Sequence, residues 1–435
     1  MARTPKTLLL GLGGLVVIAL VIALTGSGED PETGTPAPTS STSTTSSTTS
    51  STTTSTTSTT TTTTTLDPRV PYLDAIEQQA ATESDRGLAY RLVVTGLTGS
   101  QLTTRLDETV GSICVGGVFL TETNRNWAPE NDVDAFVAAV AELDAAWNSQ
   151  ECAASSFIAT DAELGSIVRV PVTSPPAPPD WTERYLTGEP YNVLLDLQAQ
   201  VAAYAQELLD LGVTVNFGAI GDVVTDPGHF MARSGRTFGD DPGVVAALSN
   251  AVIQAHCEVG VAATLKHFPN QGATVEDPHR RTSTAVGGRE LWESTGRLPY
   301  EGTGAPMVMT GHIFMNDVDP EFPASMSFAV TTGLLREELG FEGVVITDDL
   351  STMRGASDVI AEPGARAVAA VRAGADLVLF VDDRDIVDVV DALAAEMAAD
   401  PAFRARAEEA LGRALRLDLS NRQPDLFPLC GDFAE

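Results

Sequence analysis

Positive charge is scarce in this sequence of 435 residues. It holds 26 lysines and arginines against 59 aspartates and glutamates, so the formal net charge is −33. A nucleic-acid-binding protein needs a basic surface that neutralises phosphates. We therefore expect no nucleic-acid partner, and an acidic surface of this size favours solubility.

Cysteine is also rare, with four in the whole chain. Four cysteines are too few to support a disulfide scaffold of this length, so stability must come from a hydrophobic core. Hydrophobic residues make up 43% of the chain, which excludes a protein that is disordered throughout.

Several catalytic motifs are absent. The sequence has no Gly-x-Ser-x-Gly, which excludes one common class of serine hydrolase. Asp277, His279, His267 and His312 could supply metal ligands in principle, but neither His-x-His nor a helical His-x-x-x-His occurs. We expect no metal and no cofactor.

The N-terminal part reads as a membrane segment followed by a linker. Arg3 and Lys6 precede an uncharged, apolar run at 7–25, which would span about 28 Å as a helix. Residues 1–25 are either a retained signal anchor, which we favour, or a cleaved signal peptide. Residues 26–66 are rich in Ser and Thr and predict a disordered stalk. The remainder, 67–435, would be membrane-anchored and extracellular, or secreted.

The part from 67 to 435 alternates short β-rich runs with longer amphipathic helical patterns. This alternation predicts a (β/α)8 barrel of the TIM type. A doubly wound open sheet is the alternative, but no Gly-x-Gly-x-x-Gly follows the first predicted strand. We expect a monomeric single catalytic domain. The predicted strands are Leu92–Thr95, Val115–Thr121, Ser156–Asp161, Thr214–Ile220, Ala263–Phe268, Met307–His312, Gly343–Asp349 and Leu377–Val381.

The even number of cysteines in an exported domain suggests two disulfides. Cys114 and Cys152 precede neighbouring predicted strands, whereas Cys257 ends a predicted helix and Cys430 lies in the C-terminal tail. We expect the pairs Cys114–Cys152 and Cys257–Cys430; the alternative is four buried free thiols.

Charged residues gather where the predicted strands end, which is the catalytic face of such a barrel. Asp348 follows an apolar run and would be a rigidly held carboxylate nucleophile. Asp277 and His279 could pair across Pro278, because an Asp that accepts from one imidazole nitrogen fixes the tautomer of a general acid/base. Five other residues near strand ends would bind a polyhydroxylated substrate: Asp161, Arg169, Arg236, Lys266 and His267.

Two segments of the sequence resemble glycoside hydrolase family 3, and within it the single-domain β-N-acetylglucosaminidases. One is Lys-His-Phe-Pro-x-x-Gly with Asp-x-His, from Lys266 to His279. The other is Val-Ile-Thr-Asp-Asp-Leu-Ser-x-Met, from Val345 to Met353. The resemblance extends from about Arg91 to Ala414.

The resemblance implies a retaining exo-β-glycosidase that removes terminal GlcNAc from peptidoglycan fragments or related glycans. Asp348 would form a covalent glycosyl-enzyme, and His279, oriented by Asp277, would act as acid and then base. The five substrate-binding residues named above would hold the hydroxyls and the N-acetyl group of the terminal sugar.

The sequence departs from the family pattern in two places. The family's Asp-Gln-Glu-Gly-Gly-Arg segment appears as Asp161-Ala-Glu-Leu-Gly-Ser, which keeps the Asp and the Glu, with Arg169 following, and the loop that carries Asp-x-His also differs. Asn270 and Gln271 replace Gly-His, and Pro278 replaces Ser or Thr. We therefore expect a stiffer acid/base loop and an altered sugar specificity. The alternative function is a catalytically inactive, surface-anchored glycan-binding protein on the same scaffold.

Overall fold

The computed structural model describes residues 67–97, 114–122, 124, 132–148 and 157–431. The predicted membrane segment and stalk lie outside these residues. Among the helices that are described, none is long and apolar enough to cross a membrane.

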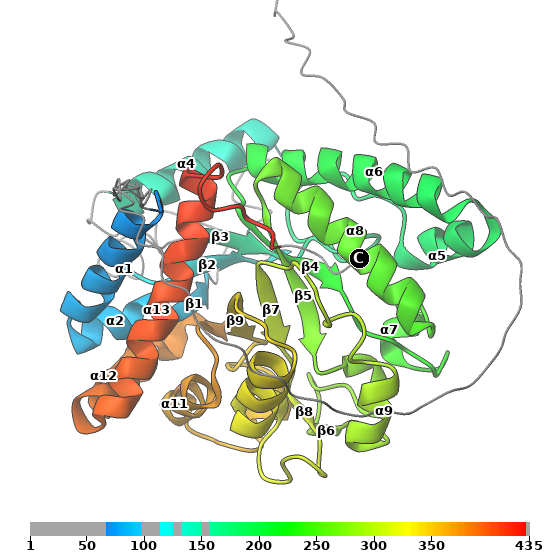
Figure 1. The fold of residues 1–435 in the computed structure, drawn as a ribbon. Coiled ribbons are helices and arrows are strands. Elements are labelled where there is room, and N and C mark those ends of the chain that lie inside the picture. The colour runs from blue at the N-terminus through cyan, green and yellow to red at the C-terminus, as the bar shows by residue number, and fades with distance from the viewer. Residues whose placement is uncertain (1–66, 98–113, 123, 125–131, 149–156, 432–435) are drawn as a thin grey trace, which may run out of the picture. The chain divides into compact units, whose positions relative to one another are not determined.

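Eight parallel strands form the centre of the fold (Figure 1). Hydrogen bonds join them in the order β10-β1-β2-β3-β4-β5-β7-β9, and a parallel bridge between Ile346 and Leu377 connects the two outer strands. The sheet is therefore a nearly closed barrel, and all eight predicted strands are confirmed. Their bounds are β1 (Val93–Gly96), β2 (Gly117–Leu120), β3 (Phe157–Thr160), β4 (Val215–Ile220), β5 (Ala262–Phe268), β7 (Met307–Thr310), β9 (Val344–Thr347) and β10 (Val378–Phe380).

The strands are apolar on both faces because both faces are covered. Val94, Phe217 and Ile346 belong to the cluster inside the barrel, whereas Val93 and Val345 belong to the cluster beneath the helices. A parallel sheet buried in this way reads as continuous hydrophobic runs rather than as alternating ones.

Helices surround the barrel, and α6 packs along α8 (Figure 1). The predicted alternation of strands with helices is confirmed, and Pro242 and Pro363 occupy the first turns of α8 and α11, where a helix tolerates proline. The helices are α1 (Val70–Thr82), α2 (Asp85–Arg91), α4 (Val133–Asn148), α5 (Pro178–Thr187), α6 (Pro190–Asp210), α7 (Phe230–Arg233), α8 (Pro242–Val259), α9 (Gly288–Ser294), the π-helix η6 (Ala329–Glu338), α10 (Arg354–Ser357), α11 (Pro363–Ala373), α12 (Ile386–Ala399) and α13 (Pro401–Arg422). A small second sheet pairs β6 (Ser283–Thr284) with β8 (Ile313–Phe314).

A buried aspartate fastens the barrel where its strands begin. Asp376, just before β10, accepts hydrogen bonds from the amide of Val345 at 2.8 Å and from Arg336 at 2.5 Å. Arg406 and Arg413 of α13 lie 2.7 and 3.1 Å from its other oxygen. One carboxylate therefore joins β9, η6 and α13 to the start of β10.

The predicted disulfide between Cys257 and Cys430 is confirmed. It attaches the C-terminal tail to the end of α8, and the two cysteines are 173 positions apart in the sequence. Cys114 is also disulfide-bonded. The predicted pair Cys114–Cys152 stays a prediction, because Cys152 lies outside the described residues.

Candidate active site

A cavity of about 440 Å³ opens where the strands of the barrel end. Seven of the eight predicted site residues line it, and the eighth, Asp277, hydrogen-bonds one of them. The lining side chains that carry polar chemistry are Glu122, Asp161, Glu163, Arg169, Arg236, Lys266, His267, His279, Asp348 and Asp349. Phe119 and Phe217, whose rings stack with centroids 5.6 Å apart, lie among the apolar lining residues.

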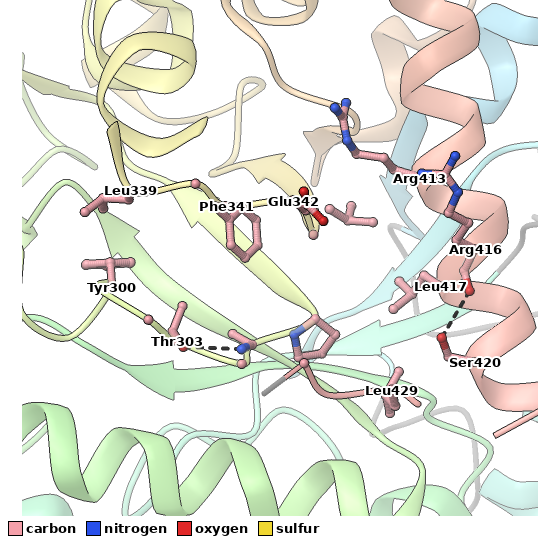
Figure 2. Close-up of a pocket in the computed structure, with 18 residues that line it drawn as sticks. Tyr300, Thr303, Leu339, Phe341, Glu342, Arg413, Arg416, Leu417, Ser420 and Leu429 are labelled. Atoms are coloured by element: carbon pink, nitrogen blue, oxygen red, sulfur yellow. Dashed lines mark hydrogen bonds between the residues drawn. The ribbon is translucent and has the colours of Figure 1, made fainter. Parts of the chain in front are cut away.

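A second cavity, also of about 440 Å³, lies at the other end of the barrel (Figure 2). Its charged lining side chains are Glu342, Arg413 and Arg416, and it contains none of the predicted site residues. Arg413 is already paired with Asp376 and Glu409. The two cavities have the same volume, so size does not distinguish them. We place the candidate site at the strand ends because the predicted acidic, basic and histidine side chains line that cavity.

The deepest polar group of the site is a buried ion-pair network around Glu163. Arg236 donates two hydrogen bonds of 2.7 Å to this carboxylate, and Lys266 Nζ lies 3.0 Å from it. Lys266 also donates to Asp161 at 2.8 Å. Burial raises the pKa of Glu163, but Arg236 and Lys266 outweigh it and bring the pKa to about 2. Glu163 is therefore ionised and holds both cations in fixed positions.

Arg169 borders the same network nearer the solvent. Its Nε lies 3.9 Å from Asp161, and its guanidinium pairs with Glu122, whose side chain is 59% exposed. Because an exposed ion pair is weaker than a buried one, Arg169 is freer to bind a ligand than Arg236.

His267 connects the floor of the site to Asp348. Its Nδ1 lies 2.7 Å from Asp222, and Asp222 also accepts from the backbone amides of His267 and Gln271. Nδ1 of His267 is assigned as the protonated donor, because the carboxylate of Asp222 can only accept. The other nitrogen, Nε2, lies 4.0 Å from Asp348 Oδ2.

The two consecutive aspartates after β9 have different surroundings. Asp349 accepts from the amides of Ser351, Thr352 and Val381, so it shapes the turn. Asp348 accepts only the Asp349 amide, at 2.8 Å, among the described residues. Its side chain is 14% exposed and faces the cavity. Asp348 is therefore the carboxylate that remains free to react.

Electrostatics keep Asp348 ionised. Burial raises its pKa, but the charges of His267, His312 and His279 and the amide of Asp349 outweigh that effect, and the pKa lies below its ordinary value. His312 itself is buried and bonded to Ser325 and to the carbonyl of Asp349, and burial lowers its pKa. An anionic carboxylate is the form that acts as a nucleophile.

The loop after β5 carries the predicted acid/base pair. His279 Nδ1 lies 2.7 Å from Asp277 Oδ1, and the His279 amide donates to the same oxygen at 3.0 Å. The His279 side chain is 55% exposed at the mouth of the cavity. The carbonyl of Pro278 accepts from the amide of Gly355 at 2.9 Å, which links this loop to α10.

Asn270, one of the departures from the family pattern, anchors the same loop. Its Oδ1 accepts from the amides of Val223 and Gly272 at 3.0 Å, and its Nδ2 donates to the carbonyl of Val223. These bonds hold the start of the loop to the segment after β4. The described residues contain no group of three or more His, Cys, Asp and Glu side chains arranged to hold a metal ion.

Glu163 and Asp222 were not predicted as site residues. Both were visible as acidic residues beyond a strand, but their partners lie 73 and 45 positions away in the sequence. Their role could have been inferred from the partner residues: Arg236, Lys266 and His267 each need a nearby anion when they are buried, and Glu163 and Asp222 supply it.

With the geometry established, comparison with known proteins identifies the family. Residues 65–416 match the model of the glycosyl hydrolase family 3 N-terminal domain. The chain belongs to this family. It is also similar to a β-hexosaminidase of Stenotrophomonas maltophilia (strain K279a), with 32% identity over 295 residues, 66% of this chain and 82% of that protein.

Two solved structures share the fold. A family 3 β-N-acetylglucosaminidase from Paenibacillus sp. str. FPU-7 has 29% identity and a TM-score of 0.69 over 78% of this chain, which spans 62% of that protein. A β-N-acetylhexosaminidase from Beutenbergia cavernae DSM 12333 has 28% identity and a TM-score of 0.67, covering 77% of this chain and 98% of its own.

Proposed function

We propose that this family 3 member is a retaining exo-β-N-acetylglucosaminidase. The observation that carries the proposal is the contrast among the carboxylates of the cavity. Glu163, Asp161 and Glu122 are each paired with a cation, and Asp349 is bonded within its turn. Among the described carboxylates that line this cavity, Asp348 alone accepts a single hydrogen bond and has no basic side chain closer than His267, at 4.0 Å, and it is ionised and 14% exposed toward the cavity.

Asp348 would attack the anomeric carbon through a carboxylate oxygen. As the glycosidic bond breaks, His279 would give a proton from Nε2 to the departing oxygen, which leaves as an alcohol. Water would then attack the covalent glycosyl-enzyme, losing a proton to His279 and restoring Asp348. The hydrogen bond from Nδ1 to Asp277 supports this role, because it places the exchangeable proton on the nitrogen opposite Asp277. A histidine as acid/base differs from the usual pair of carboxylates.

The terminal sugar would lie between Asp348 and the network around Glu163. Asp161, Lys266 and Arg169 line the cavity and carry groups that can hydrogen-bond a sugar. Arg236 and His267 line the same space, so these five residues would bind the hydroxyls and the N-acetyl group. The relatives named β-hexosaminidase and β-N-acetylglucosaminidase support GlcNAc as this sugar.

We further propose the setting in which the enzyme acts. An apolar segment within 1–25 and a Ser/Thr stalk at 26–66 would hold a monomeric catalytic domain outside the membrane, or export it if the segment is cleaved. Exported in this way, it would trim GlcNAc from peptidoglycan fragments, with chitin oligosaccharides as the other substrate to be compared.

Hydrolysis of a chromogenic aryl β-N-acetylglucosaminide tests the proposal. We expect wild-type turnover and a loss of at least about a thousandfold in Asp348→Ala, with azide restoring turnover and yielding an α-glycosyl azide. His279→Ala should lose about a hundredfold or more on poor leaving groups and far less on activated aryl groups. Binding of GlcNAc without turnover in the wild type would instead establish the inactive glycan-binding protein.

A further inference from the structure

The side chain of Asn216 in β4 lies outside the barrel wall, behind the candidate site. Successive residues of a strand point to opposite faces, and its neighbours Val215 and Phe217 belong to the cluster inside the barrel. Asn216 therefore points outward, beneath α8, which lies against β4 and β5 (Figure 1). It is fully buried and is not among the residues that line the cavity. A buried amide in this position needs hydrogen-bonding partners.

The side-chain amide of Asn216 binds both backbone groups of Ala162. Its Oδ1 accepts from the Ala162 amide at 3.0 Å, and its Nδ2 donates to the Ala162 carbonyl at 3.0 Å. The last backbone pair between β3 and β4 joins Thr160 to Asn216, so this side chain continues the pairing beyond the end of β3. Gly218 makes room for it, because a Cβ at that position would lie 2.6 Å from both the Ala162 carbonyl oxygen and Asn216 Nδ2.

Ala162 lies between two acidic residues of the site. The carboxylates of these neighbours, Asp161 and Glu163, hold Lys266 and Arg236. Successive Cα atoms are about 3.8 Å apart, so a shift of Ala162 moves both carboxylates. The amide of Asn216 therefore fixes the backbone from which the buried ion-pair network is built.

His256 of α8 fixes the orientation of the Asn216 amide. Its Nδ1 lies 2.8 Å from the carbonyl of Val252, one turn earlier in α8, and its Nε2 lies 2.9 Å from Asn216 Nδ2. Because a carbonyl can only accept, Nδ1 is assigned as the protonated nitrogen and Nε2 as the acceptor. Burial lowers the pKa of His256 to about 4, so the imidazole is neutral at pH 7 and keeps this acceptor. A flipped amide would lose its hydrogen bonds to Ala162 and to His256.

We infer that Asn216 and His256 are positioning residues for binding of the terminal sugar. The inference rests on the proposed function and goes beyond it, because neither residue lines the cavity. His256 orients the amide of Asn216, the amide fixes Ala162, and the neighbours of Ala162 place their cations against the sugar. The nucleophile and the acid/base pair lie on other segments, after β9 and after β5, so they do not depend on this amide.

Binding of GlcNAc to the full-length protein, measured by calorimetry, tests the inference together with turnover of an aryl β-N-acetylglucosaminide. Asn216→Ala leaves both backbone groups of Ala162 without their partner, and an unpaired buried group is costly. We expect Kd for GlcNAc and KM to rise about tenfold while kcat falls by less than about threefold, as happens when binding is lost equally from the substrate and the transition state.

Two variants of His256 separate positioning from packing. Gln supplies an acceptor oxygen in place of Nε2, whereas Leu fills similar space without one. His256→Gln should keep Kd within about twofold of the wild type, and His256→Leu should raise it about fivefold. Gly218→Ala keeps Asn216 but crowds its amide, so it should also weaken binding. The control is Gln254→Leu, two positions earlier in α8, which loses a hydrogen bond of 2.7 Å to Gln198 of α6 and should bind GlcNAc as the wild type does.

Four results would overturn the inference: an unchanged Kd in folded Asn216→Ala; a fall in kcat as large as the rise in Kd; equal weakening by the control; or equal Kd values for His256→Gln and His256→Leu. If Asn216→Ala does not fold, the two His256 variants and the control decide in the same way. Wild-type turnover with unchanged Kd in the variants refutes the positioning role alone. Binding of GlcNAc without turnover refutes the proposed function, and the Kd comparison still decides the positioning role. A wild type that neither binds nor cleaves refutes both.

Discussion

Replacing Glu163 with Gln tests the buried network that shapes the candidate site. Gln keeps the size of the side chain but removes its charge and one acceptor. Arg236, which is 14% exposed, loses a two-bond partner, and the buried Lys266 loses its contact at 3.0 Å. Removing one partner of a buried ion pair is costly because it leaves the other charge without compensation.

The magnitude follows from the pKa of Glu163. The pKa falls from 4.5 to about 2 on folding, which corresponds to about 3 kcal/mol of stability at pH 7. Because the folded-state pKa is depressed, this contribution is present above pH 4.5 and is lost as the pH falls toward 2. At pH 3 we expect about 1 kcal/mol to remain.

The assay is urea unfolding of wild type and Glu163→Gln at pH 7 and pH 3. Glu122→Gln is the matched control, because Glu122 lines the same cavity but is 59% exposed, and its pair should contribute at most about 1 kcal/mol. The variant should lose about 3 kcal/mol at pH 7 and clearly less at pH 3. A loss as small as that of the control, or one that does not shrink in acid, would refute the reasoning.

Three further predictions concern the strand starts, the tail and the nucleophile. Asp376→Ala should cost about 3–5 kcal/mol in the free energy of unfolding, since it leaves three partly buried arginines unpaired; a loss below 1 kcal/mol in urea titration would contradict this. Cys257→Ser with Cys430→Ser should cost about 2–5 kcal/mol, because the disulfide closes a long loop, and thermal unfolding with and without reductant measures it. The acidic limb of kcat/KM should lie below pH 3.8, because the pKa of Asp348 is lowered; a limb above pH 5 would show that this ionisation is not the one observed.

The barrel could be predicted from the sequence because its strands are buried on both faces. Val344–Thr347 and Met307–Thr310 are continuous apolar runs bounded by polar residues, and runs of that kind are recognisable without a structure. The role of helix α13 in the fold could not be predicted, for a physical reason. Its arginines 406 and 413 are seven positions apart, so they share a face, and that face points inward to Asp376. These arginines flank the apolar residues of α13 that pack into the core, such as Phe403 and Leu411, so the sequence shows the stripe but not the pairing with Asp376.

In the candidate site, too, residues in short local motifs could be predicted from the sequence, whereas residues defined by distant partners could not. Lys266, His267 and Asp348 lie in compact segments whose chemistry is readable in order along the chain. Glu163 acquires its role only when Arg236, 73 residues later, folds against it.

Residue type alone cannot decide which of the two adjacent aspartates is free to react. Asp348 and Asp349 are the same residue at the end of the same strand, and only their hydrogen bonds in the folded protein distinguish them, since the amides and hydroxyls of Ser351 and Thr352 bind Asp349. The amide of Val381 binds Asp349, and the carbonyl of Thr310 holds the backbone of Asp348 beside β7. Asp349 is therefore committed to the turn, and the barrel leaves Asp348 as the carboxylate that faces the cavity.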